Sequence, residues 1–548
     1  MHLSRIVALL VGITAPPALA APGQSPASTK SVTAEQWRQD LRFMANEMKT
    51  RHANIYHSVS AKDFDAAVAD LDRRIPQLDR NQIIVRMMRI AAMVGDGHTR
   101  IDPRKDKAFG FASLPIKLYD FDDGIFIRAV GPGQEALLGA RVEAVGGVPM
   151  EEARGRLAAL VSADNQMAAR TMVPLYLGMP DVLQAVGLST DRRSATFRLR
   201  KGERRWTVKL ASESVDPVWP PDTDVSLVTP DGWLDARRAP QPMWLQEPLT
   251  LHRLIGDPGR RFVYAQLNQG TEYKGETIDA FGKHIAELVR TQNPRALIFD
   301  VRLNYGGNGD QRHGLIRDLI RAEDDDTQLF ILTARGSFSA TQFYLEDLDR
   351  LSHGLLVGEP AAGKPISYGD AYRSIMPNSG IAIRTSISYW QSGQDHRPWT
   401  PIDVAVAYTF ADYVAGRDPV LEAALSYRPQ PSLLDRLNSA SKANGPAGAA
   451  AALSAWSSDP NHRYSDVPGD GVRFIQQMDD EAAALAASRW LAERYPRHRD
   501  AQTLHALLAE AKGQKAEALS AARLSLALDP NERQARSVIE RLTAESPR

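Results

Sequence analysis

Cysteine is absent from all 548 residues of the chain. Its absence excludes disulfide scaffolds, thiol nucleophiles, iron–sulfur clusters and cysteine-based zinc sites, so a covalent catalyst must be Ser, Thr, Lys, His or a carboxylate. Net charge is absent too, because 66 Lys and Arg balance 66 Asp and Glu. A neutral chain has no overall attraction for nucleic acid or anionic lipid, and nucleic acid is therefore not an expected partner.

Long hydrophobic runs are also missing beyond the N-terminus. No later stretch reaches the roughly 18 apolar residues of a membrane helix, so we expect no stable membrane span. The short run from Ile6 to Ala15 follows Arg5 and leads to an Ala-x-Ala sequence ending at Ala20. This pattern is typical of a cleavable export signal. We therefore expect residues 1–20 to be a signal peptide and the protein to be periplasmic or secreted.

The chain is long enough for roughly three or four domains. Residues 33–105 should form helices, which begin at a capping box made by Thr33 and Gln36. Residues 110–215 consist of short alternating runs separated by Gly, Pro and Asp turns, which favours a β-rich module. Within it, residues 139–153 resemble part of a PDZ domain, so we describe the module as PDZ-like.

Residues 216–430 alternate apolar strands and helices. The runs at 262–267, 296–299 and 329–332 are short, apolar and joined by helical segments. This arrangement predicts a layered α/β core with parallel strands.

Residues 431–548 are rich in Ala and have helical spacing. Pro496 and Pro530 lie 34 residues apart, each after a helix-like run, as in tetratricopeptide repeats. Fewer than three such repeats rarely stand alone, so we expect this tetratricopeptide-like tail to pack on the core or to bind a protein partner.

Two loops could supply a nucleophile and its anion site, because reactive groups in open α/β sheets gather at the carboxyl ends of strands. Gly306 and Gly307 follow the 296–299 strand, and their main-chain N–H groups could bind an oxyanion or could form an ordinary tight turn. Ser339 follows the next strand at the start of a helix. It is either a nucleophile favoured by the helix dipole or a helix cap.

Two candidate bases are present. Lys364 lies among glycines and apolar residues, where desolvation can make a Lys able to accept a Ser proton, although a surface Lys in a turn is the alternative. His98, in the sequence GDGHT, could act as a general base or as a structural hydrogen-bonding residue. The 12 His show no metal-ligand spacing, so we expect no metal or other cofactor.

Together these segments resemble the C-terminal processing, or tail-specific, serine peptidases. The family pattern Asp-x-Arg-x-Asn-x-Gly-Gly stands at residues 300–307, and Gly-Glu-Pro-x-x-Gly-Lys stands at 358–364. Ser339 and Lys364 lie 25 residues apart, which is the family spacing. The resemblance covers most of residues 82–430 and implies a layered, crotonase-like α/β peptidase core.

The resemblance implies a serine endopeptidase that needs no cofactor. Ser339 would attack the peptide carbonyl and neutral Lys364 would accept its proton. The oxyanion would be bound by the N–H groups of Gly306 or Gly307 and Ala340. In this family a PDZ-like module binds the C-terminus of the substrate as an added strand, which implies an unstructured protein or peptide substrate.

The sequence departs from the family pattern at Gln342, at His98 and in the first module, which lacks a clean carboxylate-binding loop. Gln342 stands where members commonly carry Glu. His98 is similar to the base of the tricorn-related branch, but Gly97 precedes it and Asp395 is the nearest candidate for the late Glu of that branch. The spacing of Lys364 favours a Ser–Lys mechanism over a Ser–His mechanism. A protein that retains the peptidase fold but binds polypeptides without cleaving them is the alternative from a different functional class.

Overall fold

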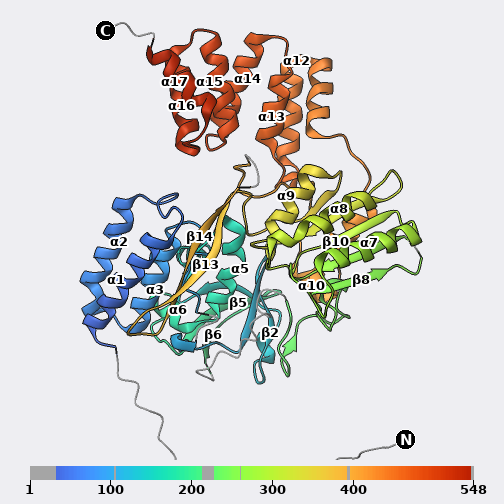
Figure 1. Cartoon of the computed structure of the whole chain (residues 1–548). Helices are drawn as coiled ribbons and strands as arrows, with labels where there is room; N and C mark the ends of the chain where they lie inside the picture. The colour runs from blue at the N-terminus through green and yellow to red at the C-terminus, as the bar shows by residue number, and fades with distance from the viewer. Residues whose placement is uncertain (1–31, 104–106, 213–226, 260, 392–394, 545–548) are drawn as a thin grey trace, which may run out of the picture.

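The computed structural model describes residues 32–103, 107–212, 227–259, 261–391 and 395–544 (Figure 1). The expected signal peptide at 1–20 lies outside these residues. Within the described part, the chain forms an N-terminal helical layer, an antiparallel sheet, an α/β core and a helical tail that stands above the body. In the described residues we find no helix with the length and hydropathy that a membrane span requires.

The N-terminal helices confirm the helical prediction for this region. They are α1 (Ala34–Arg51), α2 (Ala61–Arg74) and α3 (Arg80–Ala92). The capping box is present, since Thr33 accepts from the N–H of Gln36 and the Gln36 side chain accepts from the N–H of Thr33. The apolar residues of α1 and α3 are buried in the main hydrophobic core. This packing fixes the position of the GDGHT turn, which follows α3.

The predicted β-rich module is a seven-stranded antiparallel sheet in the order β1-β2-β3-β5-β6, with β4 beside β3 and β7 beside β2. The strands are β1 (Ile116–Phe121), β2 (Gly124–Val130), β3 (Arg141–Val145), β4 (Val148–Pro149), β5 (Ser194–Lys201), β6 (Arg204–Ala211) and β7 (Leu234–Asp235). Its helices are α4 (Met150–Ala158), α5 (Gln166–Leu177) and α6 (Pro180–Ala185). Strand β7 comes from the range expected for the core but pairs with β2.

The α/β core contains a six-stranded sheet in the order β15-β12-β11-β10-β9-β8. The strands are β8 (His252–Gly256), β9 (Phe262–Leu267), β10 (Ala296–Asp300), β11 (Gln328–Thr333), β12 (Leu355–Gly358) and β15 (Val404–Ala405). All pairs are parallel except β8 with β9, so the prediction of parallel strands is confirmed. The helices between them are α7 (Ile278–Gln292), α8 (Arg312–Ala322) and α9 (Thr341–Leu351).

A long hairpin of β13 (Ser367–Ile375) and β14 (Ala382–Trp390) leaves the core and reaches the N-terminal helices (Figure 1). Its strands pair only with each other in the described chain, apart from an isolated antiparallel bridge between Arg384 and Arg100. This hairpin was not predicted from the sequence. The two strands lie beside the GDGHT turn, where Ser386 of β14 donates to Asp96, and the functional site depends on this contact.

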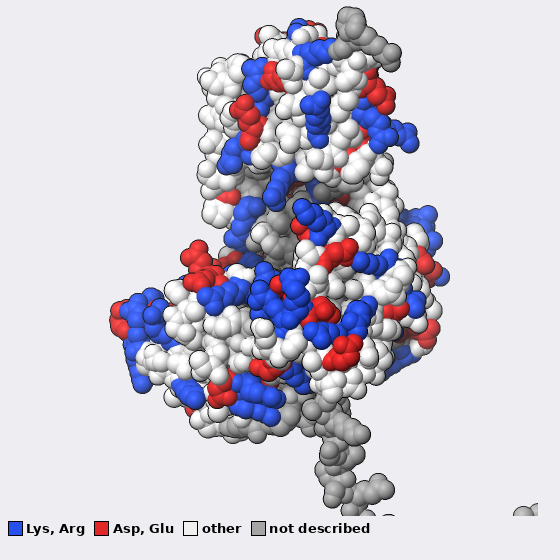
Figure 2. Space-filling model, turned by 90° about the vertical axis from the view of Figure 1, so that its left-hand side faces the viewer, with Lys and Arg blue, Asp and Glu red and all other residues white. Residues whose placement is uncertain are grey.

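The tail is helical, as predicted. Two short helices lead into it, α10 (Phe410–Ala415) and α11 (Pro419–Ser426). The tail itself comprises α12 (Leu433–Ser458), α13 (Val467–Gln476), α14 (Glu481–Arg494), α15 (Arg499–Ala511), α16 (Lys515–Leu528) and α17 (Arg533–Ala544). His396 and Arg397 tie the body to the tail through Asp529 and Asp466. Figure 2 shows the surface hollowed between tail and body, with basic and acidic side chains mixed over the face.

Candidate active site

Ser339 occupies a strained turn between a strand and a helix. Strand β11 ends at Thr333, α9 begins at Thr341, and Ser339 has a φ of +57°. Non-glycine residues rarely adopt this left-handed conformation, which exposes the hydroxyl of a nucleophile at a strand-to-helix turn. The Ser339 Oγ lies 2.9 Å from Nε2 of His98. The structure therefore pairs Ser339 with His98, although 241 residues separate them in the chain.

The glycine loop approaches Ser339 closely enough to require glycine. Gly306 has a φ of +110°, and a Cβ added there would lie 2.7 Å from Cβ of Ser339 and 3.1 Å from the amide nitrogen of Ala340. The N–H of Gly306 donates to Oδ1 of Asn304 over 2.9 Å, so it is already engaged. Within the described chain, the N–H groups of Gly307 and Ala340 donate no hydrogen bond. Of the two expected glycine donors, Gly307 is thus the available one.

His98 is held in place by the carboxylate of Asp96. Oδ1 of Asp96 accepts from the main-chain N–H of His98 over 2.9 Å, from that of Thr99 over 2.7 Å and from Oγ of Ser386 over 2.7 Å. Burial alone would raise the pKa of Asp96, but hydrogen bonds from His52 and Ser386 outweigh it and lower the pKa well below its usual range. The ionised carboxylate of Asp96 therefore holds the GDGHT turn in place and joins it to β14.

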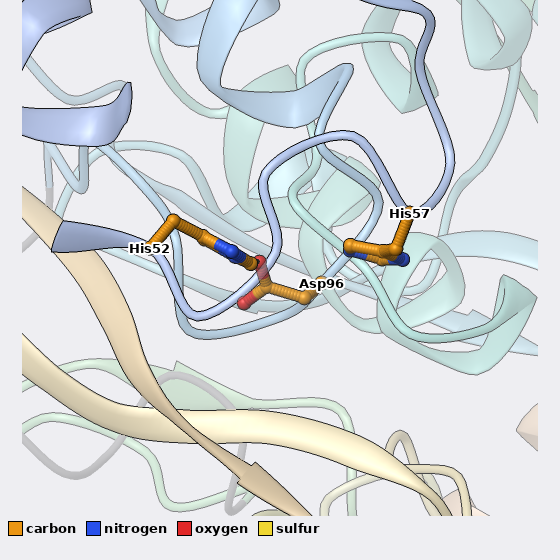
Figure 3. A group of neighbouring side chains, drawn as sticks. All are labelled: His52, His57 and Asp96. Atoms are coloured by element: carbon orange, nitrogen blue, oxygen red, sulfur yellow. The ribbon is translucent and has the colours of Figure 1, made fainter. Parts of the chain in front are cut away.

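His52 completes this support (Figure 3). Its Nε2 lies 2.9 Å from Oδ2 of Asp96, and both side chains are fully buried. His52, His57 and Asp96 have the composition of a metal site, with ligand atoms within 4.8 Å of one another. However, Nδ1 of His52 accepts the N–H of Asn54 over 2.9 Å, which places the proton of neutral His52 on Nε2, facing Asp96. Both ring nitrogens of His52 thus have partners, the N–H of Asn54 on Nδ1 and Asp96 on Nε2.

The surroundings of His98 keep its imidazole neutral. Burial, together with the charge of Arg100, lowers the pKa of His98 to about 4, although the charge of Asp96 acts in the opposite direction. Phe338 stacks on the ring, with 4.5 Å between ring centroids. A Cβ at Gly97 would lie 2.7 Å from the Phe338 ring, which explains why glycine precedes His98 in this chain. A neutral imidazole beside Ser339 can accept its proton at neutral pH.

Lys364 does not take the expected place beside Ser339. It is half-buried between β12 and β13, and no hydrogen bond joins it to Ser339 among the described residues. Its charge instead acts on Asp164, whose pKa burial raises to about 7 against the pull of Lys364. Nδ2 of Asn165 donates to the carbonyls of Ala361 and Gly363, which ties the Lys364 turn to the Asp164 segment. The geometry therefore favours a Ser–His pair over the Ser–Lys pair that the sequence spacing favours.

Other residues singled out in the sequence have structural contacts. Asp395 pairs with Arg397 and makes no contact with His98 in the described chain, so it does not support that histidine. Gln342 is buried and its Nε2 donates to Oγ1 of Thr400 over 2.6 Å. Gln342 therefore packs the start of α9 against the segment that precedes β15.

Arg302, a residue of the family motif, stabilises the core and is not part of the active site. It lies between Asp300 and Asp418, with 2.6 Å from Nη2 to the first carboxylate and 2.7 Å from Nη1 to the second. Asp418 caps the start of α11, where its side chain accepts from the N–H of Leu421. The pair of carboxylates around Arg302 thus joins the end of β10 to the start of α11.

Sequence reasoning missed the residues that support His98. The sequence does carry a signal for Asp96, because this carboxylate lies inside the GDGHT motif, two residues before His98. His52 and Ser386 gave no such signal, since they belong to α1's C-terminal cap and to β14 and reach Asp96 only through the fold.

Comparisons with known proteins place the chain beside proteases of known structure. No protein-family model and no curated protein matches it. The chain is similar to mature CPAF, with a TM-score of 0.48 and 12% identity over 72% of this chain and 96% of that chain. It is similar to the photosystem II D1 C-terminal processing protease, with a TM-score of 0.33 and 16% identity over 70% of this chain and 98% of that chain. For the tricorn protease the TM-score is 0.33 and the identity 14%, over 72% of this chain and 36% of that chain.

Proposed function

We propose that this protein is a serine peptidase of the C-terminal processing type, which hydrolyses peptide bonds of exported proteins through Ser339 with His98 as general base. The observation that carries the proposal is the 2.9 Å contact between Ser339 Oγ and His98 Nε2 at a strained strand-to-helix turn. A nucleophile bonded to a base, with free main-chain donors next to it, is the arrangement that acyl transfer requires.

The chain's own residues account for each step of hydrolysis. Ser339 Oγ attacks the carbonyl carbon of the scissile peptide bond while Nε2 of His98 takes the hydroxyl proton. The negative charge that forms on the carbonyl oxygen is stabilised by the N–H groups of Gly307 and Ala340, the second of which lies at the positive end of α9. His98 then returns the proton to the leaving amine, and an acyl ester on Ser339 remains. Water, deprotonated by His98, releases the acid and restores the serine.

The supporting modules fit an unstructured polypeptide substrate. We expect the antiparallel sheet of β1 to β6 to serve as the PDZ-like module and to bind a chain end by strand addition. The tetratricopeptide-like tail would add a surface for substrate or for a protein partner. The N-terminal sequence supports action outside the cytoplasm.

Labelling with a fluorophosphonate tests the proposed function directly. We expect the intact chain to be labelled and Ser339→Ala to lose all labelling, because the probe bonds only to an activated serine. Ser458→Ala removes an exposed tail serine and should be labelled like the intact chain. An intact chain that stays unlabelled, with native folding by circular dichroism, would instead favour the non-catalytic polypeptide-binding protein.

A further inference from the structure

The glycine loop beside Ser339 packs against a second loop, residues 268–277, which joins β9 to α7. The N–H of Gly270 donates to the carbonyl of Gly306 over 2.7 Å, and the N–H of Asn308 donates to the carbonyl of Gly270 over 2.8 Å. These two bonds make an isolated parallel bridge between Gly270 and Gly307. A Cβ added at Gly307 would lie 2.4 Å from the carbonyl oxygen of Gly270, so the two loops are in direct contact.

This bridge sets the direction of the Gly307 N–H. In a parallel bridge, one residue bonds to the neighbours on both sides of its partner, and the partner's own N–H and C=O point the opposite way. Because Gly270 bonds to Gly306 and Asn308, the N–H of Gly307 points away from the 268–277 loop. In agreement with this direction, that N–H makes no hydrogen bond within the described chain. The 268–277 loop therefore turns the donor outward and leaves it free for a substrate carbonyl.

His252, at the start of β8, holds the 268–277 loop near both of its ends. Its side chain is only 1% exposed. Nε2 of His252 lies 2.8 Å from the carbonyl oxygen of Thr271, the residue that follows Gly270. Nδ1 of His252 lies 2.8 Å from Oε2 of Glu276. A carbonyl and a carboxylate are both acceptors, so the ring donates a hydrogen bond from each nitrogen. One buried side chain thus fastens the loop that directs the oxyanion donor.

We propose that His252 is a positioning residue for the oxyanion site. Its two hydrogen bonds fix the 268–277 loop, and this loop in turn directs the N–H of Gly307 toward the substrate carbonyl. This inference rests on the proposed function. An oxyanion donor is effective because it is oriented before the reaction begins, and an amide on a loosened loop loses that advantage. His252 makes no hydrogen bond to Ser339 or His98 in the described chain, so it acts through the loop and is not itself a catalytic residue.

His252→Phe tests the proposal, because phenylalanine can keep the stacking on Phe281, where the ring centroids are 4.8 Å apart, but makes neither hydrogen bond. We expect kcat/KM for a peptide ester to fall by about ten- to a hundredfold, less than the complete loss of an oxyanion donor costs. Glu276→Gln leaves the ring in place and removes only the carboxylate charge, so it should lower the same rate by a smaller factor. It also provides the test if His252→Phe does not fold.

His284→Ala is the matched control. His284 is 63% exposed and its Nδ1 lies 2.7 Å from Oε1 of Glu276, the oxygen that His252 does not use. Its removal leaves both hydrogen bonds of His252 in place. We therefore expect the ester rate of His284→Ala to equal that of the intact chain.

A thionoester substrate separates the oxyanion site from a general disturbance of the structure. Sulfur replaces the carbonyl oxygen in this substrate and is a weak hydrogen-bond acceptor, so it gains little from the donors of the oxyanion site. The ratio of ester to thionoester kcat/KM should therefore fall in His252→Phe by the same factor as the ester rate. An unchanged ester rate, or an equal fall for both substrates, would refute the proposal. If the intact chain neither hydrolyses the ester nor reacts with the fluorophosphonate, the peptidase function itself is refuted, which keeps the two failures distinct.

Discussion

His98→Ala should reduce peptidase turnover by about 10⁴-fold, whereas Lys364→Met should keep it within about tenfold of the wild type. The reason is geometric: Nε2 of His98 lies 2.9 Å from the Ser339 hydroxyl, while Lys364 has no hydrogen bond to that serine in the described chain. Without an imidazole, the hydroxyl has no group to accept its proton. Initial rates on an unstructured protein substrate at neutral pH would measure both effects.

A control variant is needed because a lost histidine can also disturb folding. His353→Ala removes an exposed histidine on the loop before β12 and should leave turnover at the wild-type level. Loss of turnover in Lys364→Met with substantial turnover in His98→Ala would reverse the assignment of the base and restore the Ser–Lys mechanism.

Arg302→Met should lower the free energy of unfolding by about 3–5 kcal/mol, the usual cost of breaking a buried ion pair from one side. Arg302 is only 3% exposed and is bonded to both Asp300 and Asp418. Burial alone would lower the pKa of Arg302, but the two carboxylates raise it well above its usual value. Removal of the guanidinium leaves two buried carboxylates facing each other without a cation.

Urea unfolding followed by tryptophan fluorescence would measure this loss. Trp244 reports on the site because Cζ of Arg302 lies 4.4 Å from the centroid of the Trp244 ring. Arg290→Met breaks an exposed pair with Glu287, in which the two side chains are 72% and 63% exposed, and should change stability little. Asp418→Asn added to Arg302→Met should recover part of the loss by removing one uncompensated charge. Equal stability of Arg302→Met and the wild type would contradict the structural role given to this motif residue.

Local signals in the sequence were sufficient for much of the fold. Strand β9 occupies 262–267, as its apolar run predicts, and the capping box at Thr33 begins α1. Both signals are short-range, since they depend on burial of adjacent residues or on hydrogen bonds within one turn. The β13–β14 hairpin has no comparable signal. Its strands mix polar and aromatic residues, and their conformation depends on packing against distant parts of the chain.

The site shows the same division. Ser339, Gly307 and His98 were found because each lies in a motif with its own local turn. The spacing of 25 residues favours Lys364 as the base, whereas the geometry favours His98, because a spacing fixes the place of Lys364 in the chain but not the direction of its side chain. The side chain of Asn165 donates to the carbonyls of Ala361 and Gly363 and so joins the Lys364 turn to the segment of Asp164. The two bonded pairs are 196 and 198 positions apart in the chain.

The pH dependence of fluorophosphonate labelling in the intact chain tests most directly whether neutral His98 activates Ser339. The base must be unprotonated, so the labelling rate is full above its pKa and falls as pH drops through it. Because burial lowers the pKa of His98 to about 4, we predict a flat rate from about pH 9 to pH 6 and a half-maximal rate near pH 4, with folding checked by fluorescence at each point. A rate that keeps rising above about pH 8, as a lysine base requires, would contradict the account.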